Sequence, residues 1–153
     1  MCFIGVGYYV YCNFRNRKLY FASLVHFCDH LSTEIGFSKR TISQIIDTYI
    51  DGYSMQFAGN LRNYRDMLDR HEDLTADSIV LWERLNKAEA DVIRGFLMEL
   101  GRHSVTEELD KIRKARNRFE LYLNEAADKL KRDASIYLKI CILLGVGVVI
   151  VLL

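Results

Sequence analysis

Residues 140–153 read ICILLGVGVVIVLL and consist of apolar residues throughout. They end a longer stretch that begins with Ser-Val-Thr-Glu at residues 104–107, a spacing typical of a helix start because the two polar side chains cap free backbone amides. Beyond it, apolar residues recur at intervals of three and four, as they do on one helical face: Ile112, Ala115, Phe119, Tyr122, Ala126 and Leu130. The stretch predicts one long amphipathic helix that continues into a membrane anchor.

The rest of the chain also favours helices. Its 153 residues include no proline and carry a net charge of +1. The lack of proline and of alternating β-branched residues favours an all-α fold, and the balanced charge argues against a nucleic-acid partner. Helical spacing of apolar residues predicts helices over 15–36, 39–51, 54–69 and 88–100, and a further helix capped by Thr75 that contains Trp82. We therefore expect an antiparallel helical bundle over residues 14–136.

Both ends of the chain are apolar. Residues 1–13 would span only about 20 Å as a helix, against a hydrocarbon core of about 30 Å, so tilt and local thinning must help if they form an anchor. Basic residues follow this segment instead of preceding it, which disfavours a cleaved signal peptide. Residues 137–153 are predicted to be a transmembrane segment, because no polar face interrupts them as it would in a buried core helix. The predicted anchor side chains are Ile140, Ile142, Leu143, Leu144, Val148, Val149 and Ile150.

Basic residues flank each apolar end on the side of the central domain. Lys and Arg are enriched on the cytoplasmic side of membrane segments, so these charges predict a hairpin with both ends in the membrane and the bundle in the cytoplasm. The topology-setting residues are Arg15, Arg17, Lys18, Lys131, Arg132 and Lys139.

No catalytic signature is present. The chain has no phosphate loop, no zinc-protease His motif and no nucleophile elbow. We therefore expect that the protein is not an enzyme and has neither a catalytic residue nor a small-molecule substrate. His26, His30 and Glu34 are four residues apart, a spacing compatible with metal ligands or with a solvated polar face. We expect no metal and no other cofactor. The four cysteines form no CxxC pair and are interpreted as free thiols.

Several of these features together resemble the stage III sporulation protein AB family. They are the short apolar start with its basic flank, the Thr-Glu-Ile end of the first helix at residues 33–35, the segment with Trp82, the FLMELG stretch at 96–101, the long charged helix and the tail at 144–153. The resemblance covers the whole chain and is strongest at FLMELG and the tail.

The resemblance implies a function that the residues alone do not. It implies a scaffold subunit of the complex that links mother cell and forespore, in the mother-cell membrane, with a helical domain similar to those of the inner-membrane platform protein of type II secretion and type IV pilus machines. It also implies a partner ATPase, for which this chain is the membrane dock. The alternative is a generic tail-anchored helical adaptor unrelated to sporulation.

Overall fold

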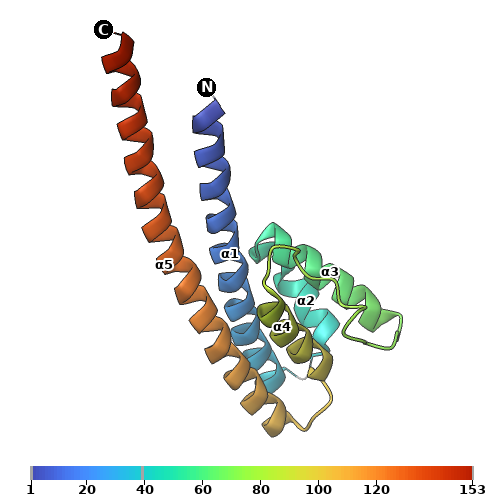
Figure 1. Cartoon of the computed structure of the whole chain (residues 1–153). Helices are drawn as coiled ribbons and strands as arrows, with labels where there is room; N and C mark the ends of the chain where they lie inside the picture. Colours follow the sequence, from blue (N-terminus) through green and yellow to red (C-terminus); the bar gives the residue numbers. More distant parts are fainter. Residues whose placement is uncertain (1, 39, 153) are drawn as a thin grey trace.

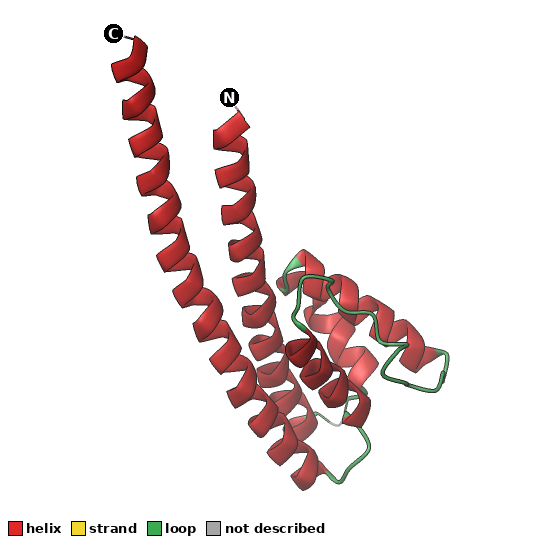
Figure 2. Ribbon diagram, viewed as in Figure 1, coloured by secondary structure: helices red, strands yellow, loops and turns green. Residues whose placement is uncertain are grey.

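The computed structural model describes residues 2–38 and 40–152, except for the side chains of residues 2–4, 6, 149 and 152. All regular structure in these residues is helical, which confirms the predicted all-α class (Figure 2). The elements are α1 (Cys2–Phe37), α2 (Ile42–Tyr49), the 3-10 turn η1 (Ile50–Gly52), α3 (Met55–Asp69), α4 (Lys87–Glu99) and α5 (Val105–Leu152).

The two long helices α1 and α5 run antiparallel side by side, and the shorter helices pack near the end where α5 begins (Figure 1). The N-terminus of α1 and the C-terminus of α5 lie at the other end, away from the bundle (Figure 1). We call residues 2–18 and 130–152, which extend from the bundle to this end, the stalk. On the α1 side the stalk still contacts the bundle, since Arg84 donates a hydrogen bond to Tyr9 and Arg17 pairs with Glu89. The predicted boundary near residue 13 is not a break in the backbone, since α1 is continuous through it.

The core of the bundle is built from the apolar faces that helical spacing predicts. On α1, Phe21, Leu24, Cys28 and Leu31 are fully buried. On α5, Ile112 and Phe119 are fully buried and Ala126 nearly so, and the ring of Phe119 packs edge-on against Phe96 of α4. Further large buried side chains come from α1 itself and from the other helices: Tyr20, Phe27, Ile45, Ile46, Phe57, Leu61, Tyr64 and Ile93.

The prediction of a helix that begins at Thr75 is wrong. Residues 70–86 form turns and irregular backbone that cross the bundle (Figure 2). Ser78 closes a turn with Thr75 at both backbone groups, and the carbonyl of Ile79 accepts a hydrogen bond from Arg94 instead of from a helical amide. Trp82 stacks on Tyr20 with ring centroids 5.5 Å apart. Hydrogen bonds and packing with the rest of the bundle therefore stabilise this segment more than a helix would.

Candidate interaction surfaces

The end of α5 exposes apolar side chains along its whole length. Their exposed fractions run from 39% at Tyr137 to 86% at Val151. The predicted anchor residues Ile140, Ile142, Leu143, Leu144, Val148 and Ile150 are all among them, and the side chain of Val149 lies outside the described part of the chain. Within the described residues, no helix is both long enough and apolar enough to qualify as a membrane span. The two anchors therefore stay predictions.

The register between α1 and α5 brings basic residues of both helices to one level. A side chain at Gly7 would approach Cys141 to 3.8 Å, and Phe14 shares a groove with Leu130 and Ala134. Since the helices are antiparallel, this register places Arg15 and Lys18 at nearly the same height along the helix pair as Lys131 and Arg132. We call these four exposed residues the basic belt. The sixth predicted charge, Lys139, is exposed further out along the stalk.

Arg17 differs from the other predicted topology-setting charges because it is part of the bundle. Its guanidinium pairs with the carboxylate of Glu89 on α4 and donates a hydrogen bond to the carbonyl of Arg84 at 3.1 Å. The Glu89 side chain is only 4% exposed. Glu89 also accepts from the amide of Asn86 at 3.1 Å, while Asn86 accepts from the amide of Glu89, so the ion pair is joined to the capping box of α4.

The polar residues considered as metal ligands are engaged by tyrosines. The ring of His30 stacks on Tyr49 with centroids 3.8 Å apart, and its Nδ1 lies 2.7 Å from the hydroxyl of Tyr53. Burial lowers the pKa of His30 below its ordinary value. The hydroxyl of Tyr49 donates to Glu34 at 2.8 Å, which lowers the pKa of that carboxyl. His26, the remaining member, is exposed.

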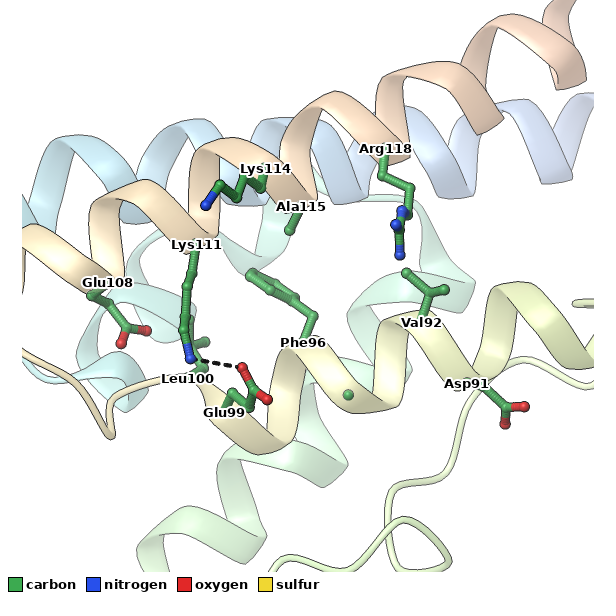
Figure 3. Close-up of a pocket in the computed structure, with 11 residues that line it drawn as sticks. Asp91, Val92, Phe96, Glu99, Leu100, Glu108, Lys111, Lys114, Ala115 and Arg118 are labelled. Carbon is green, nitrogen blue, oxygen red and sulfur yellow. Dashed lines mark hydrogen bonds and ion pairs between the residues drawn. The ribbon is translucent and has the colours of Figure 1, made fainter.

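A cleft of about 380 Å³ lies between α4 and the first half of α5 (Figure 3). Phe96 points across it toward Ala115, and Arg118 reaches down from α5 toward Val92 (Figure 3). Lys111 bridges one end by an ion pair with Glu99 at 2.9 Å, which lowers the pKa of the Glu99 carboxyl. We call this feature the α4–α5 cleft; its lining residues are Asp91, Val92, Gly95, Phe96, Glu99, Leu100, Glu108, Lys111, Lys114, Ala115 and Arg118.

Glu108 is an almost fully buried carboxylate at the Lys111 end of this cleft. It is 4% exposed, and its Oε1 accepts from the amide of Gly101 at 2.8 Å. Its Oε2 accepts no hydrogen bond from any described residue. Buried polar atoms normally have a partner, so this oxygen needs an explanation.

Fold and surfaces together define the class of protein: a helical bundle continued by a two-helix stalk with an apolar end and a basic belt. Over residues 1–153 the chain matches the family described as Stage III sporulation protein AB. The chain belongs to this family, as the resemblance in its sequence indicated, and its role is in sporulation. Comparison with curated proteins and with solved structures gives no match.

Sequence reasoning missed the α4–α5 cleft and the bundle role of Arg17. For Glu89 a local signal existed, because Asn86 and Glu89 have the spacing of a capping box that begins a helix at residue 87. For Arg17 the sequence held no local signal, since its partner Glu89 lies 72 residues away in the chain.

Proposed function

We propose that this chain is a membrane-anchored, non-enzymatic scaffold subunit of a channel complex that links mother cell and forespore. The observation that carries the proposal is the stalk, whose α5 end exposes apolar side chains from Ile136 to Val151 above the basic belt. Apolar surface of this extent is unfavourable in water and is stabilised when it is covered. A bilayer would cover it, and its anionic headgroups would face the basic belt.

The same arrangement supports a topology. With the basic belt at the cytoplasmic headgroups, the helical bundle lies in the cytoplasm and both chain ends enter the membrane. For a member of this family, that membrane is the cell membrane on the mother-cell side, the outer forespore membrane.

The bundle is the part available to other subunits. We propose that it docks a partner ATPase, which the resemblance to this family implies. The chain itself has no phosphate loop with which to use a nucleotide. The long helix α5 joins the bundle to the stalk without interruption, so a force applied at the bundle would reach the membrane through it. Family membership disfavours the alternative of a tail-anchored adaptor unrelated to sporulation.

Flotation of the purified full chain with vesicles containing anionic lipid tests membrane anchoring. Leu144→Arg places a charge in the apolar end, at a cost of about 2.5–3.5 kcal/mol if this residue lies at the centre of a bilayer. That cost corresponds to roughly a hundredfold weaker partition. Leu121→Arg is the matched control, because Leu121 is also an exposed leucine of α5 but lies outside the stalk.

We expect the wild type and Leu121→Arg to float with the vesicles, and Leu144→Arg and a chain without residues 144–153 to float much less. If the two altered chains float as fully as the wild type, the end of α5 is not the principal anchor. If the wild type itself stays at the bottom of the gradient, the membrane part of the proposal fails.

A further inference from the structure

The floor of the α4–α5 cleft is apolar and uncovered. Val92 and Phe96 of α4 and Ala115 of α5 are each partly exposed there. Gly95 lies between the first two, and a Cβ added to it would meet no atom of the described residues within 4 Å other than the backbone of its own helix. Another backbone can therefore approach α4 closely at this point, which a larger side chain would prevent.

The two rims of the cleft carry opposite charges (Figure 3). The α5 rim presents Lys111, Lys114 and Arg118, which share one helical face by their spacing. The α4 rim carries Glu99, which pairs with Lys111, and Asp91, which lies 3.8 Å from Arg94 of its own helix. On the α5 rim Lys111 pairs with Glu99 and Lys114 with Asp110 at 2.7 Å. Among the described residues Arg118 makes no ion pair, so its charge is available to a partner.

The buried carboxylate of Glu108 is a second and independent observation. Its unpaired Oε2 lies at one end of the cleft, where it can accept a hydrogen bond from an incoming N–H group. Free N–H groups of this kind are found on lysine side chains and in the first turn of a helix.

We propose that the α4–α5 cleft is the docking site for an amphipathic helix of a partner subunit. Its apolar stripe covers Phe96, its acidic edge faces the α5 rim and its basic edge faces the α4 rim. Helix-in-groove binding of this kind uses apolar residues at helical spacing as anchors. From Glu108 to Arg118 the cleft follows about 15 Å of α5, so the docked helix needs about three turns. The exposed Lys111–Glu99 pair can exchange partners at little cost when the helix enters.

This inference rests on the proposed function, because the partner ATPase is the subunit expected to supply the helix. The experiment measures binding of the purified ATPase to the full chain in lipid nanodiscs. Gly95→Trp fills the floor of the cleft, and Gly59→Trp is its control, since Gly59 lies in α3 with equally open space around it. Circular dichroism on heating checks that every variant is folded.

A second pair of variants tests the charges. Lys114→Glu combined with Arg118→Glu reverses the α5 rim, and Arg62→Glu combined with Arg113→Glu makes the same change in net charge at exposed positions outside the cleft. We expect Gly95→Trp and the rim reversal each to weaken binding at least tenfold, and both controls to remain within twofold of the wild type.

The outcomes separate the two proposals. If the wild type binds and the cleft variants bind equally well, the ATPase docks elsewhere and the inference is overturned, while the proposed function stands. If Gly95→Trp weakens binding but the rim reversal does not, the occupant is not a helix with charged edges, and the inference is again overturned. If the folded wild type does not bind the ATPase, both proposals fail.

Discussion

Replacing Arg17 by methionine separates two roles for this residue. A topology-setting charge at a membrane flank contributes little to the stability of the bundle. In the structure, however, Arg17 neutralises Glu89, whose side chain is 4% exposed while that of Arg17 is 20% exposed. Methionine keeps most of the apolar stem and removes only the charge and its hydrogen bonds.

The expected loss in the free energy of unfolding depends on the Glu89 carboxylate, which remains buried without its ion-pair partner. Removing one partner of a buried ion pair costs about 3–5 kcal/mol, because the remaining charge is uncompensated. Glu89 keeps its hydrogen bond from Asn86, and Arg17 is partly hydrated, so we expect the lower end, about 3 kcal/mol. Glu89→Gln keeps an acceptor for the capping box and leaves a guanidinium that water reaches, so we expect only about 1 kcal/mol.

Urea unfolding of the full chain in mild detergent measures these values. The single tryptophan, Trp82, stacks on the buried Tyr20, so its fluorescence reports on the bundle. With a urea dependence of about 2 kcal/mol per molar, Arg17→Met should lower the midpoint by about 1.5 M.

Arg15→Met and Lys18→Met are matched controls, since both residues are exposed neighbours on α1. Each should change the free energy of unfolding by less than about 0.5 kcal/mol. In the double variant Arg17→Met, Glu89→Gln, the loss in the free energy of unfolding should be smaller than the sum of the two single losses by about 1 kcal/mol or more. The reasoning is refuted if Arg17→Met behaves like Arg15→Met, or if the two single effects are additive.

Three further predictions concern single positions. Gly101→Ala should destabilise the chain by about 2 kcal/mol in urea unfolding, since Gly101 has φ +82° and a Cβ there would lie 2.8 Å from Ile42 Cδ1; an unchanged midpoint contradicts this. Gly95→Ala should instead stabilise it by about 0.5–1 kcal/mol, because the position is an open helix interior; a lower midpoint would show a contact that the structure lacks. The pKa of His30 is lowered by burial, so the folded chain binds fewer protons than the unfolded one. Its contribution to stability is complete above pH 6.5 and is lost as the pH falls through the lower pKa of the folded state. The midpoint should therefore fall less between pH 7.5 and 5.5 in His30→Phe than in the wild type, and equal falls would exclude this role.

Helix positions and their buried faces were predictable because they depend on residues three and four apart. The spacing of Ile112, Phe119 and Ala126 predicted the buried face of α5, and all three are buried. The same reasoning failed between Thr75 and Trp82, where the apolar residues had a plausible helical spacing. There a turn at Ser78 and a hydrogen bond from Arg94 outweigh local propensity, which amounts to less than about 1 kcal/mol per residue.

By itself, the sequence determined the all-helical class, the apolar faces, the two apolar ends and the family to which the chain belongs. Only the tertiary structure decided which faces meet. The tertiary fold brings the start of α4 within reach of α1, which turns Arg17 from a flanking charge into the partner of Glu89. The antiparallel register of α1 and α5 brings Arg15 and Lys131 to one level, and the packing of α4 on α5 opens the cleft beside Glu108. Periodicity reports which side of a helix avoids water, but it carries no information about which distant helix covers that side.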